Sequence, residues 1–171
     1  RGFTSDTLTK WGCKCNQYLD LMIPIENQES KILGWIARRQ QAIPKYFFSK
    51  GFAKSKSLFG INHLYSVETL FVVEGALDAM WLDQYNYSSV AVLGASVSKA
   101  QIDLISTLRP TEVVLSLDSD EAGQIGIAKA TVDMHNRFLL SYLELPDGYK
   151  DVQEIRNAKQ LAEVLNQKAL W

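Results

Sequence analysis

The chain has 171 residues, of which 47% are hydrophobic and 22% are charged, a composition typical of a folded globular protein with one good-sized core. No stretch approaches the roughly 20 apolar residues of a transmembrane helix, and no signal-peptide pattern is present, which argues against a membrane protein. The formal net charge is −1, so the chain as a whole is neither strongly basic nor strongly acidic. The first residue is Arg1 rather than Met, and we therefore expect a fragment of a longer protein.

Charge is unevenly distributed along the chain. Residues 1–60 contain ten Lys or Arg against four Asp or Glu, whereas residues 61–171 contain eight against fifteen. A basic front half beside an acidic back half suits a polyanion held against a metal site. Solvated faces that differ in charge explain the same counts equally well.

Two cysteines, Cys13 and Cys15, are too few and too close for a disulfide framework. No Cys or His pair follows at a spacing that would complete a zinc site, so we expect a structural or neutral role for both and a reducing compartment.

The first third of the chain predicts a small, mixed subdomain. A helix cap at residues 4–6 begins a short helix to about Trp11, and residues 18–25 and 31–38 read as two strands of a hairpin. Residues 40–57 are predicted to be irregular and basic. We expect at least two of their three adjacent aromatic residues to be buried: Tyr46, Phe47 and Phe48.

From Glu68 onward, strand and helix signals alternate. Predicted strands cover residues 70–74, 89–93, 112–117 and 138–143, and predicted helices cover 76–84, 98–107, 121–135 and much of 152–170. Continuous apolar runs such as Val113-Val114-Leu115 indicate a sheet buried on both faces, hence a parallel one. We predict an α/β fold with about four parallel strands flanked by helices, preceded by a small basic α+β subdomain, with domains at 1–66 and 67–171.

Carboxylates follow the predicted strands where each strand ends. Glu74 ends the first strand, Asp78 lies about one helical turn later, and Asp118 and Asp120 follow the third strand. Asp151 comes after the fourth strand. Each one alone would most simply be a helix cap or a surface charge. Because the carboxyl ends of parallel strands meet at one edge, the set together predicts a site for a hard cation such as Mg²⁺.

These residues resemble a known family. The apolar strand with Glu74-Gly75, Asp78, and the later strand with Asp118-x-Asp120 resemble the Toprim domain, which topoisomerases, bacterial-type primases and some nucleases share. Segments of the front half resemble the catalytic core of DnaG-type primases, which topoisomerases and small Toprim nucleases would not share. Those segments are Arg1-Gly2-Phe3, Ile32 to Arg38, Pro44-Lys45-Tyr46 and Lys54 to Gly60.

The resemblance implies roles for particular residues. It implies that Glu74, Asp118 and Asp120 are catalytic, and that these three with Asp78 and Asp151 bind Mg²⁺ or Mn²⁺. Four basic residues match those that face nucleotide and template phosphates: Arg38, Lys45, Lys54 and Lys56. One departure is Gln153, which stands where the family has a second aspartate, so a weakened metal site is expected there.

The function that the resemblance implies is that of a DNA primase core, a nucleotidyltransferase. Such an enzyme makes short RNA primers from ribonucleoside triphosphates on a single-stranded DNA template during replication. The resemblance also implies a cytoplasmic place in a bacterial cell, with a bacterial or phage gene, and a replicative helicase contacted through regions outside this chain. Two alternatives remain: a Toprim nuclease, and a catalytically weakened nucleic-acid-binding module. A dinucleotide-binding fold is disfavoured because no Gly-x-Gly-x-x-Gly follows the first strand.

Overall fold

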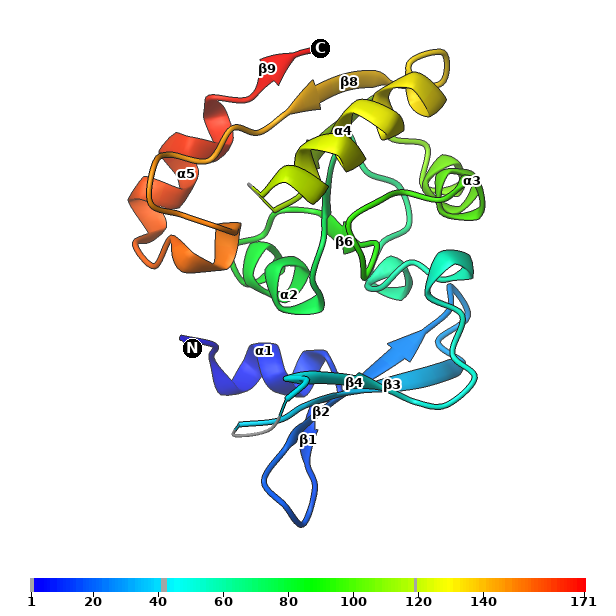
Figure 1. Ribbon diagram of the computed structural model, residues 1–171, viewed down its shortest axis with the longest axis vertical. Helices are drawn as coiled ribbons and strands as arrows, with labels where there is room; N and C mark the ends of the chain where they lie inside the picture. Colours follow the sequence, from blue (N-terminus) through cyan, green and yellow to red (C-terminus); the bar gives the residue numbers. More distant parts are fainter. Residues whose placement is uncertain (1, 41–42, 119) are drawn as a thin grey trace.

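The computed structural model describes residues 2–40, 43–118 and 120–171, and Figure 1 shows these folded into an N-terminal sheet and a larger helix-flanked sheet. The N-terminal sheet is antiparallel, in the order β1-β2-β3-β4. Its strands are β1 (Lys14–Cys15), β2 (Leu21–Glu26), β3 (Ile32–Arg38) and β4 (Tyr46–Phe48). The hairpin of β2 and β3 confirms the prediction, whereas β4 lies in a segment expected to be irregular.

The larger sheet has the order β6-β5-β7-β8-β9, and its first four strands are parallel. Its strands are β5 (Thr69–Val73), β6 (Ser89–Ala91), β7 (Glu112–Ser116), β8 (Leu139–Tyr142) and β9 (Ala169–Leu170). The predicted α/β fold with four parallel strands is thereby confirmed. Strand β9 pairs antiparallel with β8 and falls in a segment predicted to be largely helical.

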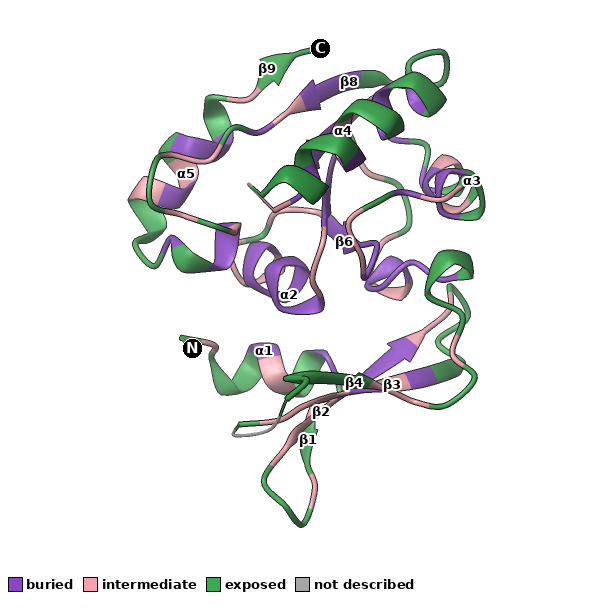
Figure 2. Ribbon diagram, viewed as in Figure 1, coloured by how far each residue is buried: buried purple, intermediate pink, exposed green. Residues whose placement is uncertain are grey.

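Helices cover both faces of the larger sheet (Figure 2). They are α2 (Ala76–Gln84), α3 (Lys99–Thr107), α4 (Glu121–Met134) and α5 (Ala158–Asn166). Phe71 and Val73 point to the face that α2 and α5 cover, whereas Leu70 and Val72 point to the face that α3 and α4 cover. This alternation is the physical reason that β5 is apolar at four consecutive positions, residues 70–73.

Helix α2 is buried along most of its length, not on one side only. Residues 76–82 are all buried. The sheet covers one side of α2, and the N-terminal segment covers the other, so the helix has no solvent face along these residues.

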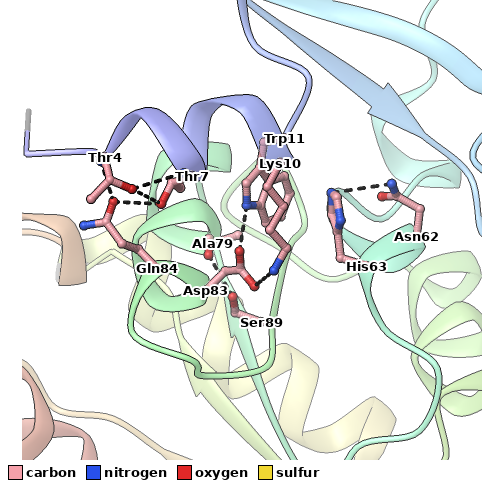
Figure 3. Close-up of polar contacts among 10 residues, drawn as sticks. All are labelled: Thr4, Thr7, Lys10, Trp11, Asn62, His63, Ala79, Asp83, Gln84 and Ser89. Atoms are coloured by element: carbon pink, nitrogen blue, oxygen red, sulfur yellow. Dashed lines mark hydrogen bonds and ion pairs between the residues drawn. The ribbon is translucent and has the colours of Figure 1, made fainter.

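Polar contacts fix the N-terminal helix α1 (Ser5–Lys10) to the end of α2 (Figure 3). Thr7 Oγ1 donates to Gln84 Oε1 at 2.9 Å. Trp11 Nε1 donates to Asp83 Oδ2 at 2.8 Å, and Lys10 Nζ lies 2.7 Å from Asp83 Oδ1. The indole of Trp11 also stacks on Phe59, 4.9 Å between ring centroids, so the two sheets share one apolar core.

The described residues contain no helix that is long and apolar enough to cross a membrane. Cys13 and Cys15 are free thiols, and burial raises the pKa of Cys13 to about 11, which agrees with the expected absence of a disulfide framework.

A polar network closes the amino edge of the larger sheet. Glu112, at the start of β7, accepts hydrogen bonds from Lys168 and from Ser141 Oγ, the latter at 2.5 Å. Burial alone would raise the pKa of Glu112, but these bonds and the Lys168 charge outweigh it, so the pKa lies below its ordinary value.

We predict that Lys168→Met lowers the free energy of unfolding by about 1.5–3 kcal/mol at pH 7, because it leaves the Glu112 carboxylate without its charged donor. The pKa of Glu112 is lower in the folded than in the unfolded chain, so the stabilisation is complete above about pH 5 and is lost at lower pH. Urea unfolding at pH 7 and about pH 3.5 measures this, with Lys159→Met as the exposed-lysine control. A deficit that is equally large at both pH values would contradict the prediction.

Two glycines let α4 lie against the strand ends. A Cβ atom at Gly123 would lie 1.9 Å from the carbonyl oxygen of Asp118, and one at Gly126 would lie 1.9 Å from that of Ala95. The contact at Gly123 fixes the first turn of α4 over the end of β7.

We predict that Gly123→Ala lowers the free energy of unfolding by about 1–3 kcal/mol, because backbone atoms on both sides of the contact must shift. Gly94→Ala is the matched control, since a Cβ atom at Gly94 meets nothing within 4 Å. Thermal or urea unfolding of the two variants measures the difference. Equal stabilities would show that the close contact is not a packing constraint.

Candidate metal centre

The carboxyl ends of β5 and β7 lie next to each other, since Val73 pairs with Ser116 in parallel register. Glu74 directly follows β5, and Asp118 follows β7 by two residues. Asp120 is the N-cap of α4, and its Oδ1 accepts from Gly123 N at 3.0 Å. The topology therefore brings three of the predicted site residues to one edge of the sheet.

Lys150 lies among these carboxylates. Its Nζ is 3.4 Å from Asp118 Oδ2 and 3.8 Å from Asp120 Oδ2. Burial raises the pKa of Asp118, while the Lys150 charge opposes the rise. The two carboxylate oxygens of Asp120 have different partners. One caps α4, which agrees with the interpretation of this residue as a helix cap, and the other faces the Lys150 ammonium group.

Glu74 and Asp78 complete the negative charge at this edge. Burial, and then the charges of Asp118 and Asp120, raise the pKa of Glu74. Asp78 is only 7% exposed, and its pKa lies well above the ordinary value because of burial and then the charges of Asp151 and Asp118. Each of the five predicted carboxylates therefore lies within electrostatic reach of at least two others, with Asp118 common to all of these groups.

Backbone N–H groups satisfy part of the hydrogen-bonding capacity of the Asp78 carboxylate. Main-chain N–H groups of Gln153 and Gly75 donate to its carboxylate, which opposes the rise in pKa. A Cβ atom at residue 75 would lie 2.6 Å from Asp78 Oδ2, so a glycine there allows the carboxylate to fold back. Asp78 Oδ1, however, is buried and has no hydrogen-bond partner among the residues that the structure describes. Asp151 caps the turn η3 (Val152–Glu154) through a 3.0 Å bond from Glu154 N.

These residues fit a divalent cation. Across residues 2–40, 43–118 and 120–171, no three His, Cys, Asp or Glu side chains already stand close enough to hold one ion. The donor set nevertheless consists of carboxylate oxygens, the ligands that Mg²⁺ and Mn²⁺ prefer. The unpartnered oxygen of Asp78 and the ammonium group of Lys150 between two carboxylates both indicate a place suited to positive charge.

A cavity of about 520 Å³ opens beside Asp118, between α4 and the loop that follows β8. Apolar and polar residues line it together, among them Gln124 and the rings of Tyr142, Tyr149 and Trp171. The sequence analysis did not single out any of these four residues.

Two of the predicted basic residues lie at the same edge of the sheet as the carboxylates. Lys54 and Lys56 form the short turn η1 (Lys54–Lys56), which one buried side chain holds in place. Gln101 Nε2, in the first turn of α3, donates to the carbonyl oxygens of Lys54 at 3.1 Å, Ser57 at 2.9 Å and Val92 at 2.9 Å. Since Val92 directly follows β6, this amide joins the basic turn to the carboxyl edge.

Arg38 and Lys45 lie on the N-terminal sheet instead. Arg38 ends β3, and its guanidinium carbon is 5.9 Å from the ring centroid of Tyr46 on β4. The main chain of Lys45 accepts a hydrogen bond from Arg39 N at 2.8 Å, directly before β4 begins.

The expectation that at least two of the three aromatic residues of β4 are buried is wrong. Tyr46 is 39% exposed and Phe47 is 50% exposed, because β4 is an edge strand of the N-terminal sheet. Arg39 lies 5.1 Å from the Phe47 ring centroid, and Lys54 Nζ lies 3.8 Å from that of Phe48.

Lys150 was not predicted as part of the site, although its place directly before Asp151 in the sequence was an available signal. Sequence reasoning also missed Gln101, whose role depends on three carbonyl groups that only the fold brings together.

Comparison with known proteins finds primases among the relatives. The chain is 30% identical to a DNA primase of Clostridium acetobutylicum over 151 residues, which is 82% of this chain and 25% of that protein. It is 28% identical to a DNA primase of Mycoplasma genitalium over 156 residues, which is 86% of this chain and 26% of that protein. The chain thus spans about a quarter of the length of these curated relatives.

Solved structures of primases share the fold. The primase fragment of the bacteriophage T7 primase-helicase superposes with a TM-score of 0.81 at 20% identity, covering 98% of this chain and 71% of that one. A DnaG primase catalytic domain bound to single-stranded DNA superposes with a TM-score of 0.75 at 23% identity, covering 96% and 63%. The Toprim-like family matches residues 71–156, which include all five carboxylates of the candidate site. The chain therefore belongs to the Toprim-like family.

Proposed function

We propose that the chain is the RNA-polymerase core of a DNA primase, which joins ribonucleotides on a single-stranded DNA template. One observation carries the proposal: the likeness to primase cores covers 98% of this chain, so it includes the N-terminal sheet as well as the acidic edge. We further propose that residues 1–66 form the template-binding subdomain and residues 67–171 the metal-binding catalytic domain.

The carboxylates at the sheet edge have distinct tasks in this proposal. Glu74, Asp118 and Asp120 would hold Mg²⁺ or Mn²⁺, with Asp78 and Asp151 sharing the charge. When bound, the metal supplies activation of the attacking hydroxyl and neutralisation of the leaving pyrophosphate. The raised pKa of Glu74 also suits this carboxylate to accept the proton of the attacking 3′ hydroxyl.

The cavity beside Asp118 supports a nucleotide as the substrate. Its volume of about 520 Å³ is within the range of small-molecule sites, and the aromatic rings that line it suit a nucleobase. A nucleotide whose base occupied this cavity would direct its phosphates toward the carboxylates at the sheet edge.

The N-terminal sheet supplies the template surface in this proposal. Arg38 and Tyr46 are directly paired across β3 and β4, as are Ile36 and Phe48, so all four side chains lie on one face. Ile36 packs into the shared core, so this is the face that the sheet turns toward the larger domain. Arg38, Lys45, Lys54 and Lys56 would neutralise template and nucleotide phosphates, and Tyr46 would stack on a base.

We propose a cytoplasmic place for the protein and a replicative helicase as a partner of the whole protein. The T7 relative, described as a primase-helicase, supports the second proposal.

We predict that Asp118→Asn or Asp120→Asn lowers primer synthesis by about 10²-fold or more, because each removes a charged oxygen ligand. The measurement is the yield of labelled oligoribonucleotides from ribonucleoside triphosphates on single-stranded DNA with Mg²⁺ or Mn²⁺. Asp133→Asn, on the exposed side of α4, is the matched control and is expected to keep wild-type activity.

The same assay separates the alternatives. Cleavage of the template without nucleotides would identify a nuclease. DNA binding without synthesis or cleavage would identify a weakened binding module. Normal synthesis by either site variant would refute the assignment of the carboxylates.

We predict that Tyr46→Leu weakens binding of a single-stranded oligonucleotide by about fivefold or more, since loss of one stacked base costs about 1–3 kcal/mol. Phe47→Leu is a stringent control, because Phe47 is the adjacent and more exposed ring but lies on the opposite face of the sheet. Fluorescence anisotropy with a labelled oligonucleotide measures both variants. Equal losses would show that the stacking face is assigned wrongly.

A further inference from the structure

Lys150 occupies an unusual position for a surface lysine. Its ammonium group lies 3.4 Å and 3.8 Å from two different carboxylates, Asp118 and Asp120, rather than in close contact with one. Its charge also opposes the rise in the pKa of Glu74 that burial and the neighbouring carboxylates cause. One ammonium group thus faces three of the carboxylates that would hold metal.

The main chain of Lys150 is held by a hydrogen bond, whereas its long side chain reaches the carboxylates from a largely exposed position. Its main-chain N–H donates to Glu154 Oε2 at 2.8 Å, and the neighbouring Asp151 caps the turn to Glu154. The side chain of Lys150 is 58% exposed. A long side chain on a fixed anchor can redirect its charge without moving the loop.

We propose that Lys150 is a resident counter-ion that a divalent cation displaces and that then contacts the polyphosphate of the nucleotide. In the metal-free protein its ammonium group offsets the repulsion between Asp118 and Asp120. An ion held by these two carboxylates would lie a few ångströms from the ammonium group, and like charges at that distance repel strongly. The side chain therefore leaves, and its anchor keeps it beside the site where phosphates arrive. This inference rests on the proposed function.

The proposal predicts competition between Lys150 and the metal. Lys150→Met removes the charge and keeps most of the length, so it is expected to bind Mn²⁺ about three- to tenfold more tightly at low salt. Lys150→Arg keeps the charge and is expected to bind Mn²⁺ like the wild type. Titration of the free protein with Mn²⁺, followed by electron paramagnetic resonance, measures the affinity directly.

Lys159→Met is the matched control for net charge, because Lys159 is 88% exposed and pairs with Glu163 on its own helix. Its Mn²⁺ affinity is expected to equal that of the wild type. An unchanged affinity in Lys150→Met would overturn the proposal by making Lys150 a bystander. A weaker affinity would also overturn it, by making Lys150 a residue that positions the ligands.

Two further readouts test the two halves of the proposal. In EDTA, Lys150→Met is expected to unfold at a lower temperature than the wild type, and added Mg²⁺ is expected to narrow that gap. With Mg²⁺ present, tripolyphosphate is expected to bind Lys150→Met about fivefold more weakly, since one cationic partner is missing. Equal melting temperatures in EDTA would refute the counter-ion role, and equal tripolyphosphate affinity would refute the phosphate contact.

Failure of this inference is distinguishable from failure of the proposed function. If wild type binds Mn²⁺, Asp118→Asn does not, and Lys150→Met behaves like wild type, only the role of Lys150 is refuted. If wild type binds no Mn²⁺ at millimolar concentration, both the metal centre and the displacement are refuted.

Discussion

Crowding of negative charge at one edge of the parallel sheet is the constraint on which the site depends. Because β5 and β7 are neighbours, Glu74 and Asp118 must end up close together, and α2 brings Asp78 into the same region with only 7% exposure. Repulsion and burial raise the pKa of all three carboxyl groups. The unfolded chain carries no such repulsion, so ionisation of this edge opposes folding as the pH rises. Backbone N–H groups and Lys150 offset part of that cost.

The carboxylate at one end of β7 stabilises the fold, whereas the carboxylate at the other end belongs to the candidate metal site. At its amino end, Glu112 accepts bonds from Lys168 and Ser141, and its pKa is lowered. At its carboxyl end, Asp118 lies in a set of carboxylates whose pKa values are raised. One carboxylate therefore stabilises the folded sheet and the other destabilises it. Carboxylates that repel one another in the free protein favour the binding of a cation, since the bound ion relieves their repulsion.

The carboxylate cluster could be predicted from the sequence because parallel topology alone determines which strand ends meet. Continuous apolar runs located the four parallel strands to within about two residues. Strands β4 and β9 were missed because they have only three and two residues, too few to show a periodic pattern, and form as edge strands of their sheets. The exposure of Tyr46 was predicted wrongly for the same reason, since it depends on β4 being an edge strand. The place of Lys150 depends on the path of the loop after β8, which no local pattern specifies.

The acidic edge is proposed to bind a divalent cation at the place where Lys150 now neutralises Asp118 and Asp120. Anomalous X-ray diffraction from crystals of the protein soaked in Mn²⁺ tests this proposal. We expect an anomalous peak bonded to oxygens of Asp118 or Asp120, with the Lys150 ammonium group moved away from both. No peak at this edge, or a peak elsewhere with the Lys150 contacts intact, would contradict it.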